Sequence, residues 1–249
     1  MYVKISIIIA SYNAEATIEK ALESVIQQTY NDWECIIIDG ASKDRTIEIA
    51  QKFMSKDSRI KVYSEPDKGV YDAFNKGWKR AKGEWIYYLG CDDELLPNGL
   101  EDLMTNSIGV DFVYGSFVRR YKNGKTKIVS SGLFEKEMPY SLATSHQAML
   151  MKRSLIERVG GFNLKYKILA DYDLINHAYY LGMKTRRTNA NIAIFQVGGL
   201  STDNLSSLKE RYRILVSYHV MPFFALTHCI GMGIFFVLCK IKHNFLDNL

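Results

Sequence analysis

Residues 3–10 read Val-Lys-Ile-Ser-Ile-Ile-Ile-Ala, a short apolar run that is typical of a strand buried on both faces of a sheet. Similar runs at residues 34–38, 59–63 and 85–89 predict three more strands. Apolar residues at helical spacing predict a helix after each of the first three strands, over residues 14–28, 44–54 and 70–81. Because strand and helix alternate, we expect an α/β fold with a doubly wound, mainly parallel sheet.

The second half of the chain has a different pattern. Two predicted strands, residues 111–117 and 125–130, flank Asn123-Gly124, which is a strong signal for a hairpin turn. Further strands are expected at residues 147–152 and 184–196, with a helix over residues 170–181 between them. This half is therefore mixed α+β, and we expect it to extend the same sheet rather than to form a separate domain.

Polar residues follow the predicted strands of the first half. Asn13, Asp39, Asp67 and the pair Asp92-Asp93 each come shortly after the end of a strand. In doubly wound sheets, ligands bind outside the carboxyl ends of the strands. The sequence therefore predicts a ligand site along that edge of the sheet.

The 249-residue chain is mildly basic, with a formal net charge of +5. Such an excess suits anionic ligands, for example nucleotide diphosphates, or an acidic membrane surface. No dense basic block is present, so we expect no nucleic-acid partner. The four cysteines have no metal-ligand spacing and are interpreted as free thiols in a reducing compartment. The apolar run at residues 5–10 is too short for the core of a signal peptide, so no export signal is expected.

Three consecutive acids, Asp92-Asp93-Glu94, repel one another unless a cation compensates them. Magnesium and manganese bind a few carboxylate oxygens together with phosphate oxygens of a substrate. The alternative is a solvated acidic turn that caps the following helix. Asp39 can accept hydrogen bonds from a base or a ribose, or it can cap a turn. Neither a Gly-x-Gly-x-x-Gly sequence nor a Walker loop occurs, so a dehydrogenase or a P-loop enzyme is not expected.

Several motifs, taken together in this order and spacing, resemble those of family 2 glycosyltransferases: Ala-Ser-Tyr-Asn at 10–13, Ile-Ile-Asp-Gly-Ala-Ser-Lys-Asp at 37–44, Ser-Glu-Pro-Asp-Lys-Gly-Val-Tyr-Asp-Ala-Phe-Asn-Lys-Gly at 64–77, Ala-Lys-Gly-Glu-Trp-Ile at 81–86, Asp92-Asp93, Gly160-Gly161-Phe162 and Ala170-Asp171-Tyr172-Asp173. The resemblance extends from residue 3 to residue 205. Two further motifs resemble the bacterial members that build O-antigen, capsule and colanic-acid repeat units: Ser145-His146-Gln147 and Gly198-Gly199-Leu200-Ser201.

The resemblance implies a Rossmann-like GT-A fold over residues 1–205, with a nucleotide-sugar-binding half (1–100) and an acceptor half (101–205). It implies four uridine-contacting positions: Ala10, Ser11, Tyr12 and Asp39. Asp92 and Asp93 correspond to the D-x-D region of the family, which binds the donor and holds Mn²⁺ or Mg²⁺ across its diphosphate. Gly90 stands where the first acid of that motif is expected, which leaves open which carboxylate touches the metal.

Asp171 matches the catalytic base of the family, although Ala170 stands where a Glu commonly precedes it. Asp171 and Asp173 open a predicted helix, and acids in a first turn can equally serve as caps because they meet the positive end of the helix dipole. Of the two, we prefer Asp171 as the base and regard Asp173 as a possible acceptor contact. His146 precedes a predicted strand and is either structural or in contact with the acceptor or a diphosphate.

The C-terminal segment, residues 206–249, is expected to be helical and to associate with a membrane. No Asp, Glu, Lys or Arg occurs at residues 214–239. An interfacial anchor is our preferred interpretation, with Arg211, Arg213, Lys240 and Lys242 at the lipid headgroups. A true membrane span and a helix packed within the protein or at a dimer interface are the alternatives.

The function expected from these features is that of an inverting glycosyltransferase of surface-polysaccharide biosynthesis, such as O-antigen assembly. The donor is expected to be a UDP-sugar carrying a hexose, galactose or glucose, and the acceptor a saccharide on undecaprenyl diphosphate. The enzyme is expected at the cytoplasmic face of the bacterial inner membrane. Two alternatives remain open: a sugar-nucleotide pyrophosphorylase, and a non-catalytic nucleotide- or glycan-binding module.

Overall fold

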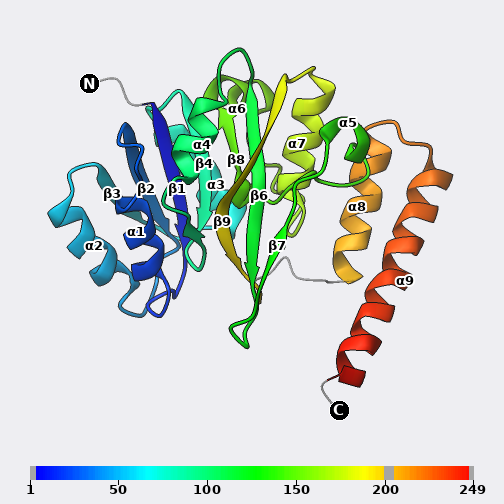
Figure 1. Ribbon diagram of the computed structural model, residues 1–249, viewed down its shortest axis with the longest axis horizontal. Coiled ribbons are helices and arrows are strands. Elements are labelled where there is room, and N and C mark those ends of the chain that lie inside the picture. Colours follow the sequence, from blue (N-terminus) through cyan, green and yellow to red (C-terminus); the bar gives the residue numbers. More distant parts are fainter. Residues whose placement is uncertain (1–3, 199–204, 247–249) are drawn as a thin grey trace.

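The computed structural model of the chain describes residues 4–198 and 205–246. Nine strands form one mixed sheet in the order β3-β2-β1-β4-β8-β6-β9-β5, and β7 pairs with β6 at its side (Figure 1). Strands from both halves of the chain share this sheet. The expected mixed α/β fold is confirmed. The motif segment Gly199-Leu200-Ser201 lies outside the described residues.

The first half forms the parallel part of the sheet. Its strands are β1 (Ile5–Ser11), β2 (Trp33–Asp39), β3 (Ile60–Ser64) and β4 (Trp85–Gly90), and each paired neighbour runs parallel. The helices between them are α1 (Ile18–Ile26), α2 (Thr46–Lys56) and α3 (Val70–Arg80). These elements agree with the prediction, with differences of a few residues at their ends.

Two apolar cores explain why β1 is apolar at nearly every position. Ile5, Ile7 and Ile9 pack into the core on the face covered by α1. Ile8 and Ala10 point to the other face, where they meet residues of α3. Since successive side chains of a strand point to opposite faces, a strand covered on both sides needs a continuous apolar run.

The second half adds antiparallel pairings and then a long final strand. Its strands are β6 (Phe112–Arg120), β7 (Thr126–Val129), β8 (Met149–Lys152) and β9 (Thr185–Gln196), and the short β5 (Glu94–Leu95) from the end of the first half pairs antiparallel with β9. β8 is antiparallel to both β4 and β6, whereas β9 is parallel to β6. The helices are α4 (Gly99–Thr105), α5 (Phe134–Glu137), α6 (Arg153–Val159) and α7 (Ala170–Tyr180).

One predicted strand begins later than expected. Residues 147–152 were predicted as a strand, but His146–Ala148 form a single 3₁₀ turn and β8 starts at Met149. The turn is held by Tyr87, whose hydroxyl donates a hydrogen bond to the carbonyl of Gln147. The turn also directs the side chain of Gln147 toward Asp93. The hydrogen bond between Gln147 and Asp93 thus forms where strand pairing was expected.

The C-terminal segment folds into two helices, α8 (Leu205–Ser217) and α9 (Pro222–Leu246), which run in opposite directions beside α7 and α5 (Figure 1). A small apolar cluster joins them to α7: Tyr172, Ile214, Leu215 and Ala225 are all buried in it. Among the described residues, no helix combines the length and apolar character that crossing a bilayer requires.

Candidate active site

A cavity of about 530 Å³ lies at the carboxyl ends of β1 and β4, at the predicted edge of the sheet. Ala10, Ser11 and Tyr12 line it, and so do Asp92 and Asp93. We refer to it as the donor cavity. Tyr12 keeps 63% of its surface exposed. The structure thus brings together three predicted uridine contacts and the predicted metal ligands.

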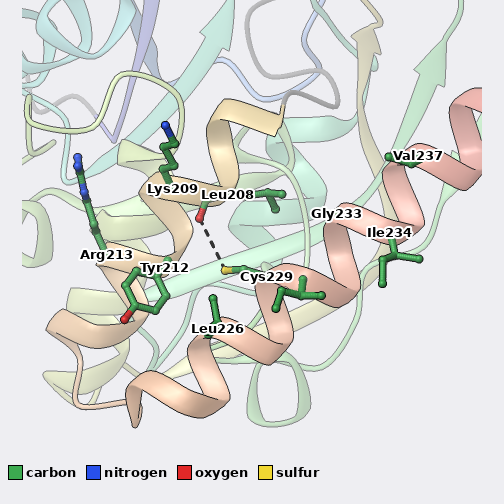
Figure 2. Close-up of a pocket in the computed structure, with 10 residues that line it drawn as sticks. Leu208, Lys209, Tyr212, Arg213, Leu226, Cys229, Gly233, Ile234 and Val237 are labelled. Atoms are coloured by element: carbon green, nitrogen blue, oxygen red, sulfur yellow. Dashed lines mark hydrogen bonds between the residues drawn. The ribbon is translucent and has the colours of Figure 1, made fainter.

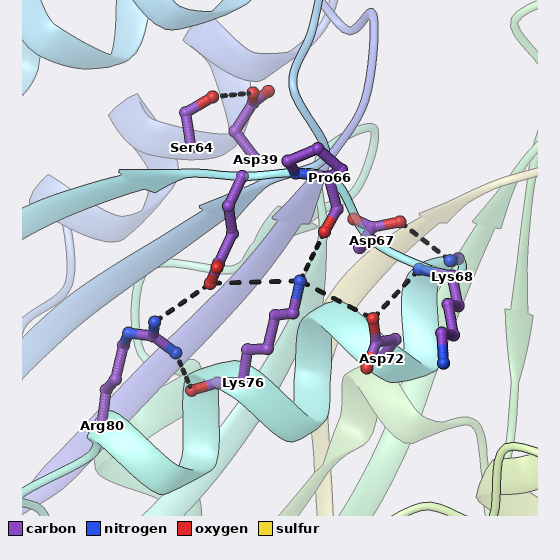
Figure 3. Close-up of polar contacts among 10 residues, drawn as sticks. Asp39, Ser64, Pro66, Asp67, Lys68, Asp72, Lys76 and Arg80 are labelled. Atoms are coloured by element: carbon purple, nitrogen blue, oxygen red, sulfur yellow. Dashed lines mark hydrogen bonds and ion pairs between the residues drawn. The ribbon is translucent and has the colours of Figure 1, made fainter.

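Asp39, the fourth predicted uridine contact, does not line the donor cavity. It is 1% exposed. Its carboxylate accepts hydrogen bonds from the hydroxyls of Ser11 (3.2 Å), Ser64 (2.8 Å) and Ser42, and from the backbone N–H of Ser42 (2.9 Å). Figure 3 shows the bond to Ser64. In this structure Asp39 ties three neighbouring segments together, and its contact with uridine stays a prediction.

The turn after β3 brings Asp67 to the donor cavity, in agreement with the ligand site predicted at this edge of the sheet. A network of polar contacts fastens this turn to α3 (Figure 3). Lys76 donates a hydrogen bond to the carbonyl of Pro66 (2.7 Å), and Arg80 pairs with Glu65 (3.0 Å). Asp67 itself accepts a hydrogen bond from the backbone N–H of Gly69 (2.8 Å). The wall of the cavity is therefore braced by the helix behind it.

Asp93 is the more constrained acid of the pair. It is 2% exposed, and its two oxygens accept hydrogen bonds from the side-chain amide of Gln147 (2.7 Å) and the backbone N–H of Gln196 (2.9 Å). Burial, followed by the negative charge of Asp92, raises the pKa of Asp93 to about 6. Burial likewise raises the pKa of Asp92 above its ordinary value. Both acids would be stabilised as anions by a cation in the cavity.

The glycine in place of the first D-x-D acid has a steric explanation. A Cβ atom at Gly90 would lie 2.5 Å from Oδ2 of Asp93 and 2.9 Å from Oδ1 of Asp92. The two carboxylates already occupy the space that a third acid would need.

Two adjacent carboxylates with raised pKa values fit a divalent cation whose remaining ligands are phosphate oxygens of a substrate and water. The described part of the chain holds no cluster of three or more His, Cys, Asp or Glu side chains arranged to bind a metal. A metal in the donor cavity therefore depends on ligands from the substrate.

A second cavity, of about 480 Å³, adjoins the first, and we refer to it as the acceptor cavity. Asp171 lines only the acceptor cavity, whereas Asp92 and Asp93 line only the donor cavity. Three residues line both: His146, Ile168 and Phe195. The predicted base and the predicted metal ligands thus lie on two sides of a shared boundary.

Three donors surround the carboxylate of Asp171. Nδ1 of His146 lies 3.3 Å from Oδ2, the hydroxyl of Tyr71 lies 3.2 Å from Oδ1, and the backbone N–H of Tyr172 donates to Oδ1 at 2.8 Å. Burial raises the pKa of Asp171, but the hydrogen bond and charge of His146 and the bonds from Tyr172 and Tyr71 together lower it below its ordinary value. Its side chain is 17% exposed, toward the acceptor cavity. Asp171 is therefore an accessible anion at neutral pH.

Asp173, the other acid of this helix, lines neither cavity. It is 8% exposed, and the hydroxyl of Tyr218 lies 3.3 Å from Oδ1. Burial raises its pKa. The structure does not bring Asp173 to the site, so its predicted acceptor contact has no geometric support.

The segment before α7 is held by a residue that no sequence motif marks. The carboxylate of Glu210, in α8, accepts hydrogen bonds from three consecutive backbone N–H groups, those of Lys167 (2.7 Å), Ile168 (3.0 Å) and Leu169 (2.9 Å). From the other side, Tyr71 of α3 donates its hydroxyl to the carbonyl of Ile168 (2.7 Å). Lys167 and Ile168 also line the donor cavity. Glu210 therefore helps to shape the site from outside it.

The sequence assigned Arg211 to lipid headgroups, and its position in the structure differs from that expectation. Arg211 lines the acceptor cavity, where it donates a hydrogen bond to the carbonyl of Tyr140 (2.7 Å). Arg119, which received no role, lines the same cavity. Arg213 is exposed, and the side chains of Lys240 and Lys242 lie outside those that the structure describes.

The sequence model of glycosyl transferase family 2 matches residues 6–168. A "PGL/p-HBAD biosynthesis glycosyltransferase" of Mycobacterium tuberculosis is 33% identical over 204 residues, which cover 79% of this chain and 78% of that protein. WfaP of Escherichia coli, a "UDP-Glc:alpha-D-GlcNAc-diphosphoundecaprenol beta-1,3-glucosyltransferase", is 30% identical over 220 residues and 86% of each chain.

A solved structure of S. aureus TarS, residues 1–349 in complex with UDP-GlcNAc, superposes with a TM-score of 0.72 at 19% identity. The match covers 94% of this chain and 72% of that one. At this level of identity the likeness concerns the fold, and it supports a GT-A-like α/β architecture for residues of both halves.

Proposed function

Since this chain belongs to glycosyl transferase family 2, we propose that it transfers a hexose from a UDP-sugar to a saccharide carried on undecaprenyl diphosphate, with inversion at the anomeric carbon. One observation carries the proposal: Asp92 and Asp93 line one cavity, Asp171 lines its neighbour, and His146 borders both. A single displacement needs this separation, because the acceptor oxygen attacks from the side opposite to the departing diphosphate.

In the donor cavity, the exposed ring of Tyr12 offers a face on which uracil stacks. Asp92 and Asp93 would hold the metal, Mn²⁺ or Mg²⁺, and its positive charge would stabilise the departing nucleoside diphosphate. Gln147 and the backbone N–H of Gln196 keep Asp93 in place for this role.

In the acceptor cavity, Asp171 accepts the proton of the acceptor hydroxyl. As that oxygen forms its bond to the anomeric carbon, the bond between this carbon and the diphosphate oxygen breaks. The lowered pKa keeps Asp171 ionised and ready to take the proton at neutral pH. His146 and Tyr71 hold the carboxylate in a single orientation.

The identity of the substrates is supported by the relatives. The printed name of WfaP specifies UDP-glucose as donor and a GlcNAc-diphosphoundecaprenol as acceptor. On this basis we favour glucose over galactose, and assembly of O-antigen or another bacterial surface polysaccharide as the pathway. Membership of a transferase family also disfavours the pyrophosphorylase alternative.

The same proposal places the enzyme on the cytoplasmic face of the bacterial inner membrane as a peripheral protein. α9 carries a stripe of apolar side chains that are about half exposed: Leu226, Ile230, Ile234 and Val237. Together with α8 they line an apolar groove of about 650 Å³, with Lys209 and Arg213 at its α8 side (Figure 2). An apolar surface flanked by cations suits insertion among anionic lipids.

The test is a screen of UDP-sugars with synthetic saccharides on a lipid diphosphate, followed by determination of the anomeric configuration of the product. We expect hexose transfer with inversion that requires added Mn²⁺ or Mg²⁺. Formation of a UDP-sugar from UTP and a sugar 1-phosphate, without transfer, would instead identify a pyrophosphorylase. Binding of UDP without any turnover would identify a binding module.

A further inference from the structure

Two guanidinium groups line the acceptor cavity together with Asp171. Arg119 comes from β6 and Arg211 from α8, so they reach the cavity from elements that are far apart in the sequence. Both side chains are partly buried. In each, Nε is buried and has no hydrogen-bond partner among the described residues. Each group therefore retains a donor that nothing in the described chain satisfies.

The structure shows no counter-ion for either arginine among the residues that it describes, whereas the adjacent Arg120 pairs with Glu94 and Arg153 pairs with Glu157. Partial burial of a positive charge without a partner costs free energy, which an anionic ligand would offset. The arrangement is therefore suited to receive negative charge from outside the chain.

Arg211 is held in place by contacts that leave Nε free. Its Nη1 donates to the carbonyl of Tyr140 (2.7 Å), and its Cζ lies 4.5 Å from the centre of the Tyr172 ring. Tyr172 directly follows Asp171 in α7, and Arg211 and Asp171 line the same cavity. An anion bound by Arg211 would consequently lie in the cavity of the predicted base.

The acceptor cavity is lined by charges of both signs. Asp171 and Glu137 also line it, and both repel an anion. The uncharged sugar hydroxyls therefore suit the region of Asp171, and phosphate oxygens suit the two arginines. Guanidinium groups bind phosphate by paired, charge-assisted hydrogen bonds, and two of them balance the two charges of a diphosphate diester.

The apolar groove between α8 and α9 provides a surface for the lipid chain that is attached to such a diphosphate. Arg211 belongs to α8, and other residues of α8, Leu208 and Tyr212, line the apolar groove with α9 (Figure 2). A hydrophobic chain that leaves a diphosphate at Arg211 thus has an apolar surface on the same helix.

From these observations we infer that Arg119 and Arg211 form a subsite for the diphosphate of a lipid-linked acceptor, separate from the donor cavity. The inference rests on the proposed transferase function and adds the residues that recognise the charged part of the acceptor. The donor diphosphate belongs to the cavity of Asp92 and Asp93, so the two diphosphates occupy different sites.

Binding can be tested without turnover. Farnesyl diphosphate, a short prenyl diphosphate, is titrated by calorimetry into the full-length protein whose donor cavity is saturated with UDP and Mn²⁺, and farnesol serves as the uncharged probe. We expect Arg119→Gln and Arg211→Gln each to weaken binding of farnesyl diphosphate by about 10- to 100-fold. Arg158→Gln, which removes the same charge from the exposed surface of α6 outside both cavities, should leave it unchanged.

The affinity for UDP reports whether each variant is folded. The inference is overturned if wild-type protein does not bind farnesyl diphosphate under these conditions, or if the two variants bind it as tightly as wild-type does. It is also overturned if the variants lose as much affinity for farnesol as for farnesyl diphosphate. A wild-type protein that binds farnesyl diphosphate through both arginines but transfers no sugar would reject the transferase proposal and keep the subsite. If both variants transfer sugar to a diphosphate-linked acceptor as fast as wild-type does, the subsite inference is rejected and the transferase proposal is kept.

Discussion

Three hydrogen-bond donors stabilise the carboxylate of Asp171 as an anion, the form that a general base requires. Replacing it with Asn keeps the shape and one hydrogen-bonding oxygen but removes the proton acceptor. We expect Asp171→Asn to lower kcat by about 10²–10⁴-fold, the usual contribution of a general base. Calorimetric titration with UDP and Mn²⁺ should give nearly the wild-type dissociation constant, because the donor cavity does not include Asp171.

Asp173 offers the matched control for this experiment. It lies two residues along the same helix but faces Tyr218 rather than the acceptor cavity. We expect Asp173→Asn to lower the melting temperature and to leave kcat close to that of wild-type. If Asp173→Asn is inactive and Asp171→Asn turns over normally, the base has been assigned to the wrong carboxylate.

The charge of His146 is expected to affect the pH dependence of the reaction through Asp171 and also through Asp92 and Asp93, because it lowers the pKa of all three carboxyl groups. This histidine lowers the pKa of Asp171 through a hydrogen bond and its charge, against the effect of burial. Without the ring, the pKa of Asp171 rises, and a higher pH is needed to ionise the base. We therefore expect His146→Ala to move the acid limb of the kcat/KM profile to higher pH, and Tyr71→Phe to move it less in the same direction. An acid limb that stays in place in both variants would exclude this coupling.

Asp93 links metal binding to stability. Its pKa of about 6 lies above that of an exposed Asp, so its ionisation costs free energy in the folded state as pH rises through 6. Below that pH the protonated acid avoids the cost but cannot bind a metal. We expect Mn²⁺ with UDP to raise the melting temperature more at pH 7.5 than at pH 5. A rise in melting temperature that is equal at the two pH values would argue against a metal at this pair of acids. A rise that is as large in Asp92→Asn/Asp93→Asn as in wild-type would do the same.

Sequence patterns located the acids of the site but not all their surroundings. Asp92 and Asp93 follow a buried strand, and the rule for doubly wound sheets was enough to place them at the site. The same rule could not separate them from Asp39, since only the folded chain surrounds Asp39 with three serines. Arg119 and Arg211 could not be associated from the sequence, because β6 and α8 contribute to one cavity only in the folded molecule.

At the scale of elements, the entry to α7 depends on α8. The carboxylate of Glu210 accepts hydrogen bonds from three backbone N–H groups directly before the helix that carries Asp171. We expect Glu210→Ala to lower the free energy of unfolding by about 1–3 kcal/mol, because three backbone N–H donors lose their partner. It should also lower kcat at saturating substrate, since the base loses its fixed position. Denaturant unfolding and steady-state kinetics measure the two effects.

Glu157→Ala provides the comparison for Glu210. Glu157 lies on the surface of α6 in an i,i+4 pair with Arg153, which is half exposed and contributes little to stability. Glu210→Gln keeps an acceptor oxygen and should recover part of the rate. A rate that falls equally in Glu157→Ala, or not at all in Glu210→Ala, would remove the link between α8 and the base.

Regular elements of the first half were predictable because periodicity alone marks them: β1 alternates between two cores and therefore reads as a continuous apolar run. The start of β8 was not, because the preceding turn is set by Tyr87 and by the path of Gln147 to Asp93. For the C-terminal segment the absence of charge indicated apolar helices. Its division at residues 218–221, and its packing on Tyr172, required the tertiary structure.

For the whole molecule, the apolar stripe of α9 predicts how the protein meets a membrane. Leu226, Ile230 and Ile234 are each more than half exposed, so their replacement leaves the core intact. We expect Leu226→Ser/Ile230→Ser/Ile234→Ser to weaken sedimentation with phosphatidylglycerol-containing vesicles by at least about tenfold, since burial of each such side chain contributes about 1.5–3 kcal/mol.

Two exposed apolar residues elsewhere provide the control for the vesicle experiment. Ile108 and Ile128 are 79% and 58% exposed and lie outside α9. Their joint replacement with Ser should leave vesicle binding unchanged. Wild-type protein that remains in the supernatant with these vesicles would exclude the membrane-binding role of α9.

Two contacts tie the two halves of the chain together. β5, at residues 94–95, pairs with the final strand β9, and Tyr71 reaches across to the carbonyl of Ile168. Recombination between relatives must respect this connection. A chimera that exchanges residues 101–249 to change acceptor preference also exchanges the partners of β5 and Tyr71. Exchange of residues 101–249 alone is thus not expected to transfer acceptor preference. An active chimera has to keep matched residues at both contacts.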